Sequence, residues 1–384
     1  MCGITGIYSL NNDPIDPYDI TRQTETIIHR GPNEGGQFLS PRQNCGLGIR
    51  RLSIIDVAGG QQPLSNEDNS IHLVYNGETY NHKLLRAELE ALGHRPKTHS
   101  DAEAILHGYE AWGAKGILQR IRGMGAFALW DETEQQLLLA RDRFGIKPLY
   151  YAHFQNRLYF ASEIKAILSD PQVPRRINLA ALQAMFTVGF VPGPATMFEG
   201  IYKLPAAHLL IARDGNLHLE NYWTLDYEEN QKISEGEAVE QFLDLLKEAI
   251  DIRLMSEVPL GALLSGGLDS STLVALMQAG LNQLSTNGQR ISENTDQWFK
   301  KNRTLHTISI GFDQAEYNES RKAQTLAKVV GTTHHPITFT LKDFEIYPQI
   351  VSHLEEPQCY ATTIPIYLLY QACQQAGLTV ILTG

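Results

Sequence analysis

The chain opens with Met1-Cys2-Gly3-Ile4-Thr5-Gly6, and small and β-branched residues continue this opening to Leu10. The run predicts a β-strand, Ile4 to Leu10, that begins almost directly after a cysteine. Removal of the initiator methionine would leave Cys2 with a thiol and a free α-amino group. Because such an amine has an ordinary pKa of ~7.7–8.0, it can act as a general base for the thiol. A cysteine here is equally compatible with a small buried hydrophobe, so other residues must decide.

Three further groups favour the chemical interpretation. Tyr75-Asn76-Gly77-Glu78 follows an apolar strand and offers an amide side chain and a glycine N–H that can approach a ligand closely. Such donors stabilise the oxyanion that forms when a thiol attacks an amide carbonyl. Arg51 supplies a planar guanidinium for a carboxylate, and Asp101 supplies a negative charge for an ammonium group. These are the charges that a site for free glutamine requires.

Eight motifs follow one another over the first 210 residues. In chain order they are Cys2-Gly3-Ile4, His29-Arg30-Gly31-Pro32, Arg51-Leu52-Ser53-Ile54-Ile55-Asp56, Asn76-Gly77-Glu78-Thr79-Tyr80-Asn81, Ser100-Asp101-Ala102-Glu103, Phe127-Ala128-Leu129, Arg141-Asp142-Arg143-Phe144-Gly145-Ile146-Lys147-Pro148-Leu149-Tyr150 and Ala161-Ser162-Glu163-Ile164-Lys165. The ordered set closely resembles the glutaminase domain of the glutamine-hydrolysing asparagine synthetases, a family of class II glutamine amidotransferases. The resemblance implies an N-terminal-nucleophile fold, an αββα sandwich.

The resemblance also implies residue roles. Catalysis falls to Cys2 as nucleophile and to Asn76 and Gly77 as the oxyanion hole. Arg51 takes the carboxylate of glutamine. The residues expected to bind glutamine are Arg51, Leu52, Ser53, Ile54, Ile55, Asn76, Gly77, Glu78 and Asp101. Gly125 departs from the family, which more often has a bulky residue there, and we expect slightly looser packing around it. His29 and Arg30 are expected to order the loop over the pocket.

A second motif, Leu263-Leu264-Ser265-Gly266-Gly267-Leu268-Asp269-Ser270-Ser271, follows an apolar strand and precedes a helix. The glycines allow a tight turn, and the N–H groups at the helix start favour an anion. Asp269 offers a carboxylate to Mg²⁺. The motif lacks the lysine of a Walker loop. It resembles the pyrophosphate-binding loop of enzymes that split ATP into AMP and pyrophosphate.

Placed after a glutaminase domain, this loop resembles the synthetase half of the same family. The residues expected to bind ATP and pyrophosphate are Leu264, Ser265, Gly266, Gly267, Asp269, Ser270, Ser271, Ile310, Thr383 and Gly384, with Asp269 as the Mg²⁺ ligand. In the family, an acidic Glu-Gly-(Ala/Ser)-Asp-Glu run and a lysine-bearing helix come next. Neither is in these 384 residues, so we expect a C-terminally truncated chain that does not complete amide synthesis.

The acceptor is less well defined. The stretch from Glu355 to Pro365 matches a family segment near the aspartate site. Many members have an aspartate where Ala361 stands, and two serines where Thr362 and Thr363 stand. Aspartate is therefore the default acceptor, and another carboxylate, such as a sugar acid or a peptide, is the alternative.

The distribution of elements predicts two domains. Short strands with two helices fill the first part, and from Asn230 onward helical stripes alternate with strands. We predict a glutaminase domain over residues 1–215 and a partial ATP-pyrophosphatase domain over residues 230–384. Alternating strands and helices predict a doubly wound parallel sheet in the second domain. Residues 283–303 are polar and are expected to form an insertion.

Composition excludes several classes of protein. The chain carries 32 basic and 43 acidic residues, a net charge of -11, so nucleic acid is not expected as a partner. No apolar run suits a membrane span, and no signal peptide is apparent. Four cysteines without a CxxC pair fit a cytoplasmic protein without structural zinc. His334 and His335 are adjacent on a strand and point to opposite faces, so they do not predict a shared metal.

These observations predict an asparagine synthase that uses glutamine as its amide donor and ATP as a substrate, with Mg²⁺. The products would be asparagine, AMP, pyrophosphate and glutamate. A glutaminase-only fragment and a non-catalytic sensor of glutamine or nucleotide remain alternatives, and a metal hydrolase lacks apparent clustered ligands. A homodimer is compatible with the sequence, which does not fix the assembly.

Overall fold

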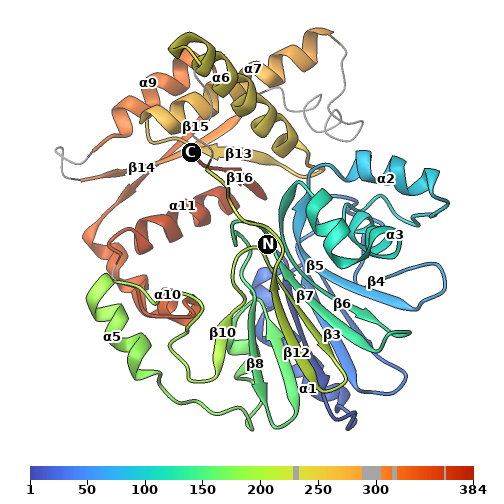
Figure 1. Cartoon of the computed structure of the whole chain (residues 1–384). Coiled ribbons are helices and arrows are strands. Elements are labelled where there is room, and N and C mark those ends of the chain that lie inside the picture. Colours follow the sequence, from blue (N-terminus) through green and yellow to red (C-terminus); the bar gives the residue numbers. More distant parts are fainter. Residues whose placement is uncertain (228–232, 288–303, 314–317, 359) are drawn as a thin grey trace. The chain divides into compact units, whose positions relative to one another are not determined.

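The computed structural model describes residues 1–227, 233–287, 304–313, 318–358 and 360–384 (Figure 1). Its backbone forms two compact units. The first comprises Met1–Tyr227 together with Glu355–Cys359, and the second comprises Glu228–Leu354 together with Tyr360–Gly384. The predicted domain limits at residues 215 and 230 stay a prediction. Most of the expected insertion, residues 288–303, lies outside the described residues.

Two six-stranded antiparallel sheets form the first unit. The first sheet has the order β10 (Ile201–Lys203), β8 (Tyr150–Phe154), β9 (Arg157–Ala161), β1 (Gly3–Ser9), β3 (Cys45–Arg51) and β2 (Glu34–Leu39). The second has the order β12 (Asn216–Asn221), β11 (His208–Arg213), β7 (Gln136–Arg141), β6 (Gly123–Asp131), β5 (Ile71–Thr79) and β4 (Leu64–Ser65). Strand β1 thus lies inside its sheet, between β9 and β3.

The two sheets pack face to face and are covered by helices on their outer faces. The central core joins Ile4 and Leu47 of the first sheet to Val74 and Trp130 of the second. Helices α1 (Pro17–Thr26) and α4 (Ile164–Ile167) cover the first sheet, while α2 (His82–Ala91) and α3 (Glu103–Arg120) lie on the side of the second. This is an αββα sandwich, so the predicted fold of the first unit is confirmed.

Burial on both faces explains the composition of β1. All seven of its residues, Gly3–Ser9, are buried, because the central core lies on one side and α1 on the other. A residue at the very start of this strand is therefore held at a fixed place in the interior rather than on a loose terminus. The remaining helix of the unit, α5 (Leu179–Val188), begins at Asn178, whose side chain accepts from the N–H of Ala181.

The second unit contains a parallel sheet with the order β15 (Thr333–Phe339), β14 (His306–Phe312), β13 (Leu260–Leu263) and β16 (Val380–Leu382) among the described residues. Its helices are α6 (Glu235–Asp251), α7 (Leu268–Asn287), α9 (Ser320–Val330), α10 (Tyr347–His353) and α11 (Thr363–Gln375). A capping box between Ser234 and Glu237 begins α6.

Helices cover both faces of this sheet. On one face, Ile250 of α6, Met277 of α7 and Ala323 of α9 pack against β13. On the other, Cys373 of α11 packs with Ile308 of β14. The predicted doubly wound parallel sheet is thus confirmed. Within the described part of the chain, no helix is both long and apolar enough to cross a membrane.

Candidate active site

Cys2 lies immediately before β1 and is half-buried against the central core. Its thiol donates to the carbonyl oxygen of Leu52, with an Sγ···O distance of 3.7 Å. Its own carbonyl oxygen accepts from Nε of Arg30 at 2.9 Å. Burial raises the pKa of the Cys2 thiol, although the hydrogen bond to Leu52 opposes this change. The thiol therefore needs a nearby base to become a nucleophile.

A salt-bridged group fixes the backbone of Cys2. Arg30 follows α1 in the short 3-10 turn Ile28–Arg30, and its Nη1 lies 3.0 Å from Oε1 of Glu163. His29 Nε2 lies 3.0 Å from the same oxygen. Glu163 accordingly keeps a pKa below its usual value, because its hydrogen bond and charge contact with Arg30 outweigh its burial. These contacts join His29 and Arg30 to Glu163 and Arg30 to the Cys2 backbone, and the expectation that the pair orders the loop over the pocket stays a prediction.

Asn76 supplies the most informative contact pattern of the site. It lies on β5 with Val74 and Glu78 two positions away on either side, and Val74 belongs to the central core. Because strand residues alternate between faces, Asn76 and Glu78 face the interior between the sheets. Asn76 is 1% exposed, and its Nδ2 has no hydrogen-bond partner within the described residues. A buried amide donor without a partner costs free energy, so a ligand atom is the expected acceptor.

Gly77 faces the other side of β5, where no side chain would fit. A Cβ there would lie 2.4 Å from the carbonyl oxygen of Met124 and 2.5 Å from the Tyr75 ring. The N–H of Tyr75 donates to Oε1 of Gln62 at 2.7 Å. Backbone N–H groups two residues apart on a strand point to the same neighbouring strand. The N–H of Gly77 therefore points in the same direction as that of Tyr75, to the edge of β5 that faces away from β6.

The Tyr75 ring also fills the space beside Gly125. A Cβ on Gly125 would lie 2.4 Å from Cε2 of Tyr75. The ring is buried, and its hydroxyl hydrogen-bonds with Thr79 Oγ1 at 3.1 Å. The expectation of looser packing around Gly125 is therefore wrong. The Tyr75 ring fills the volume that a side chain at position 125 would take.

The segment after β3 carries the predicted carboxylate site. Arg51, the last residue of β3, is 4% exposed, and its guanidinium contacts Glu34 and donates to the carbonyl oxygens of Ile55 and Asp56 at 3.0 and 2.8 Å. Ser53 Oγ donates to Glu34 Oε1 at 2.8 Å. These contacts fold residues 51–56 around one guanidinium. Leu52 and Ile54 are half-buried, and Ser53 and Ile55 are buried.

Two carboxyl groups lie near one another in the same interior. Oδ2 of Asp101 accepts from the N–H of Thr79 at 2.6 Å, which places Asp101 beside the end of β5. Burial raises the pKa of Asp101 to about 6, while its backbone hydrogen bonds and Arg51 oppose that change. Burial also raises the pKa of Glu78, and the charge of Asp101 raises it further. This pair of carboxyl groups is suited to receive an ammonium group, which would lower both pKa values.

Lys147 and the terminal amine complete the charges around Cys2. Burial lowers the pKa of Lys147, and the nearby Glu78 opposes this change. Its Nζ lies 3.2 Å from Sδ of Met1. Burial lowers the pKa of the Met1 α-amino group to about 6, and Arg30 and Lys147 lower it further. The α-amino group of Met1 is therefore favoured in its neutral form at neutral pH.

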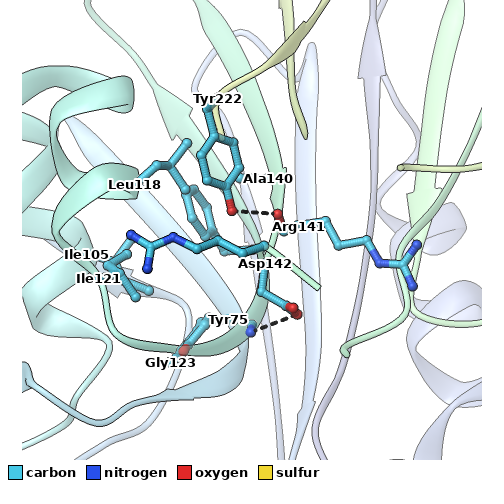
Figure 2. Close-up of a pocket in the computed structure, with 12 residues that line it drawn as sticks. Tyr75, Ile105, Leu118, Ile121, Gly123, Ala140, Arg141, Asp142 and Tyr222 are labelled. Carbon is cyan, nitrogen blue, oxygen red and sulfur yellow. Dashed lines mark hydrogen bonds between the residues drawn. The ribbon is translucent and has the colours of Figure 1, made fainter. Parts of the chain in front are cut away.

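A pocket lies on the face of β5 and β6 opposite to the one that carries Asn76 and Glu78. It is lined by Tyr75, Ile105, Leu118, Ile121, Gly123, Gly125, Phe127, Ala140, Arg141, Asp142, Arg143 and Tyr222. Figure 2 shows Tyr222 pointing its hydroxyl at the Arg141 carbonyl oxygen, at a distance of 2.8 Å. The N–H of Gly125 donates to Asp142 at 3.1 Å. Because Cys2 is not in the lining, this pocket is separate from the site around the thiol.

In the second unit, the predicted phosphate loop runs from the end of β13 into α7. Gly267 N–H donates to Ser265 Oγ at 3.1 Å, and Ser265 Oγ hydrogen-bonds with Ser270 Oγ at 3.0 Å. Gly266 has a φ of 81°. A Cβ on Gly266 would lie 2.7 Å from Cβ of Lys322 and 2.8 Å from the N of Ala323, so the loop packs tightly on α9. These contacts require glycine at position 266.

The other predicted ATP contacts lie at the same edge of the sheet. Leu264 is buried, and its N–H donates to the Ile308 carbonyl oxygen, which places Ile310 next to Ser265 on the adjoining strand. Thr383 and Gly384 follow β16, and a Cβ on Gly384 would lie 2.7 Å from the N of Ser270. Asp269 and Ser271 belong to the first turn of α7, and Asp269 is exposed. The structure thus brings all of these residues to the carboxyl ends of parallel strands, where such folds bind ligands.

Sequence comparisons agree with this division. Residues 1–223 match the model of the glutamine amidotransferase domain, and residues 241–384 match that of asparagine synthase. "Asparagine synthetase [glutamine-hydrolyzing] 1" of Bacillus subtilis is 33% identical over 391 residues, covering 100% of this chain and 57% of the relative. "Asparagine synthetase B [glutamine-hydrolyzing]" of Escherichia coli is 30% identical over 390 residues, covering 100% of this chain and 63% of the relative. Glutamine phosphoribosylpyrophosphate amidotransferase from B. subtilis, complexed with ADP and GMP, is a structural neighbour with a TM-score of 0.44 and 14% identity, over 100% of this chain and 90% of that one.

The fold and the residues around Cys2, with the first domain match, define a glutamine amidotransferase domain of the N-terminal-nucleophile type. A synthetase domain follows it in the same chain. The chain belongs to the family of glutamine-hydrolysing asparagine synthetases. It spans little more than half of the length of the B. subtilis relative.

Proposed function

We propose that the chain hydrolyses glutamine at Cys2 and that the ammonia is used to amidate a carboxylate activated by ATP. The observation that carries the first half is the buried Nδ2 of Asn76, which faces the interior between the sheets without a partner among the described residues. An unpaired donor on β5, in the core against which Cys2 packs, is what thioester chemistry at this cysteine requires.

The first half-reaction uses groups of this chain alone. Once Met1 has been removed, the α-amino group of Cys2 takes the thiol proton, and the thiolate attacks the side-chain amide carbon of glutamine. Asn76 Nδ2 and the Gly77 N–H donate to the oxyanion. Its collapse breaks the C–N bond, and the protonated amine gives its proton to the departing ammonia. Water then hydrolyses the thioester, which yields glutamate and restores the thiol.

Substrate binding relies on complementary charges. Arg51 receives the α-carboxylate of glutamine, while Glu78 and Asp101 receive its ammonium group. The residues from Leu52 to Ile55 form the wall of the pocket. This arrangement is supported by the folding of residues 51–56 around the Arg51 guanidinium and by the two neighbouring carboxyl groups at the end of β5.

The second half-reaction would take place at the phosphate loop. Leu264, Ile310 and Thr383-Gly384 would contact adenine, and Ser265 to Ser271 would hold the phosphates against the N-terminus of α7. A Mg²⁺ ion, which would neutralise phosphate charge, suits the exposed carboxylate of Asp269. The acceptor carboxylate becomes an acyl-adenylate with release of pyrophosphate, and ammonia displaces AMP. With aspartate as acceptor, the product is asparagine.

The acceptor and the cellular setting belong to the same proposal. Aspartate is the first choice because of the family, and another carboxylate is the alternative because Ala361 stands where many members have an acid. Ala361 and Thr362 are exposed. We also propose a cytoplasmic protein, whether monomer or homodimer, that acts on small molecules and not on nucleic acid. The net charge of -11 supports the last point.

The proposal is tested by glutamate release from glutamine, measured with the purified chain and with its Cys2→Ala variant. We expect release by the wild-type chain, none by the variant, and a mass that shows loss of Met1. Equal rates for both proteins, or full activity with Met1 retained, would contradict the mechanism. For the second unit, ATP binding is compared between the wild-type chain and Asp269→Asn in the presence of Mg²⁺.

A further inference from the structure

Four side chains with metal-binding atoms meet outside the site around Cys2. Glu67 lies in the loop between β4 and β5, and His94 follows α2. His107 and Glu110 stand one turn apart on α3. One donor atom from each of the four residues lies within 4.8 Å of all the others. Figure 1 shows α2, α3 and β4 together on one side of the first unit.

The separations of the donor atoms suit one small ion. Nδ1 of His107 lies 2.9 Å from Oε2 of Glu110 and 3.5 Å from Oε2 of Glu67. Nδ1 of His94 lies 3.6 Å from Oε2 of Glu110. Tetrahedral zinc with bonds of about 2.0–2.2 Å places neighbouring ligand atoms roughly 3.3–3.6 Å apart. These separations bracket this range, so small side-chain shifts would bring the four donor atoms to it.

A surrounding set of hydrogen bonds aims these donors at one another. Nε2 of His107 hydrogen-bonds with Oε2 of Glu103 at 3.1 Å, so Nδ1, which hydrogen-bonds with Oε2 of Glu110 at 2.9 Å, points to the shared centre. Glu103 is itself held by the N–H groups of Lys97 and Thr98, at 3.1 and 2.9 Å. A carboxylate behind a histidine in this way is the usual support of a metal-binding imidazole.

The two outer carboxylates are held in the same manner. Oε1 of Glu110 accepts from Nδ2 of Asn66 at 2.8 Å, so that Oε2 remains toward the centre. Oε1 of Glu67 accepts from the N–H of Arg95 at 3.0 Å. This last bond joins the loop after β4 to the loop after α2. This backbone hydrogen bond therefore holds Glu67 and the loop that carries His94 together next to α3.

We propose that Glu67, His94, His107 and Glu110 bind a single divalent ion of the zinc type. Two imidazoles and two carboxylates form a donor set that suits Zn²⁺, and with four protein ligands the site would be structural rather than catalytic. Exposure falls from 39% for the Glu67 side chain to 1% for that of His107, so the ion has a path from solvent. The bound ion would fasten two loops and α3 to each other.

The test uses the full chain, stripped with a chelator and titrated with Co²⁺ and then Zn²⁺. We expect one ion per chain, the visible absorption of tetrahedral Co²⁺, loss of that absorption on adding Zn²⁺, and a higher unfolding midpoint with Zn²⁺ bound. His94→Ala and Glu67→Gln remove ligands that are not fully buried, and each should weaken binding by at least tenfold. Glu103→Gln removes the support behind His107, and we expect about 10–100-fold weaker binding with a changed Co²⁺ spectrum.

Controls separate this site from other candidates. His306 Nδ1 and His335 Nε2 lie 3.0 Å apart on β14 and β15. The variant His335→Ala therefore tests whether this histidine pair of the second unit binds the ion instead. Cys2→Ala tests the reactive thiol. Both variants should keep one tight ion per chain. Absence of binding to the folded wild-type chain, or binding that His94→Ala and Glu67→Gln leave unchanged, would overturn the proposal. Glutamine hydrolysis is assayed separately, since its loss or retention does not bear on this site.

Discussion

At the scale of single residues, a substitution of Asn76 gives the most direct test of the proposed chemistry. Asn76→Ala removes the unpaired Nδ2 donor, and the loss of one oxyanion donor lowers kcat by about 10²–10³. We expect kcat for glutamine hydrolysis to fall by this factor with little change in KM, because the donor acts on the oxyanion rather than on bound glutamine.

Asn76→Asp is the matched control for packing at this position. It keeps the volume of the side chain and replaces the donor by an acceptor, so we expect it to be as inactive as the alanine variant. Unfolding midpoints of both variants show whether the fold is retained. A folded Asn76→Asp variant with the wild-type kcat would contradict the assignment of the oxyanion hole.

Asp101 should determine how glutamine binding depends on pH. Burial raises its pKa to about 6, so the carboxyl group is ionised above that pH and protonated below it. A protonated Asp101 cannot hold the ammonium group of glutamine by charge. We therefore expect kcat/KM to fall as the pH decreases through about 6.

Asp101→Asn tests this assignment because its Oδ1 can still accept from the Thr79 N–H. We expect KM at neutral pH to rise by roughly tenfold or more, as for loss of a charged hydrogen bond. The inflection near pH 6 should disappear, as measured from pH profiles of kcat/KM. A variant that keeps both the wild-type KM and this inflection would exclude Asp101 from the ammonium site.

The residues proposed to act were visible in the sequence, whereas the contacts that hold them in place were not. A cysteine at position 2 and an Asn-Gly pair after a strand have a direct chemical interpretation. The bond from Arg30 to the Cys2 carbonyl and the link from Arg30 to Glu163 join positions 28 and 133 residues apart. Such contacts depend on which strands become neighbours, and local pattern carries no information on that. The family motifs contained both residues without assigning these contacts.

At the scale of elements, the loop between β13 and α7 depends on one glycine. Gly266→Ala would adopt a φ of 81° at a cost of about 1 kcal/mol. Its Cβ would also meet Lys322 and Ala323 of α9, and overpacking of this kind costs about 1–3 kcal/mol more. We expect a lower free energy of unfolding for the second unit and weaker ATP binding.

Gly331→Ala is the matched control. Gly331 ends α9 with a φ of 82°, and a Cβ there would meet nothing within 4 Å. Gly331→Ala should therefore lower the free energy of unfolding only by the cost of a positive φ for alanine, and it should leave ATP binding unchanged. Urea unfolding and ATP titration of both variants measure these effects. Equal losses for both variants in stability and in ATP binding would mean that the packing of the loop on α9 is unimportant.

Periodicity predicted the long amphipathic elements and failed for short or polar ones. The first of the helical stripes predicted from Asn230 onward is the helix α6, Glu235–Asp251. The strand β15, Thr333–Phe339, extends to both sides of the His334-His335 pair that the sequence placed on a strand, and its histidines bond to β14. Helix α1 was missed, although Asp16 and Pro17 are a capping residue and a first-turn proline. The strand β3 ends at Arg51, whose guanidinium donates to the carbonyl oxygens of Ile55 and Asp56.

At the scale of the whole molecule, the assignment of residues 355–359 to the first unit could not be predicted from the chain order. These residues follow α10 by sequence, and a linear division would leave them in the second unit. The cluster of Glu67, His94, His107 and Glu110, proposed above to bind a metal ion, was likewise missed, because its four side chains come from three separate parts of the first unit. In both cases the sequence shows the side chains but not the tertiary contacts that bring them together.

The contacts of Glu356 make this assignment testable. Its Oε2 lies 2.6 Å from Nζ of Lys203, and its Oε1 accepts from the N–H of Met197 at 2.9 Å, so both partners belong to the first unit. Glu356→Gln keeps an acceptor for Met197 and removes the charge that faces Lys203. Because the pair is mostly but not fully buried, we expect a loss of about 1–2 kcal/mol after allowance for screening.

The loss should appear in the unfolding of the first unit, although residue 356 is more than a hundred positions beyond its main segment. Each unit has its own hydrophobic core, so the two are expected to unfold in separable steps. Amide hydrogen exchange, followed in peptides from β1 and from β13, distinguishes them. Faster exchange in β1 with unchanged β13 is the expected result. The control Glu345→Gln changes an exposed residue of the second unit and should leave β1 unaffected. Faster exchange in β13 alone for Glu356→Gln would place residues 355–359 with the second unit instead.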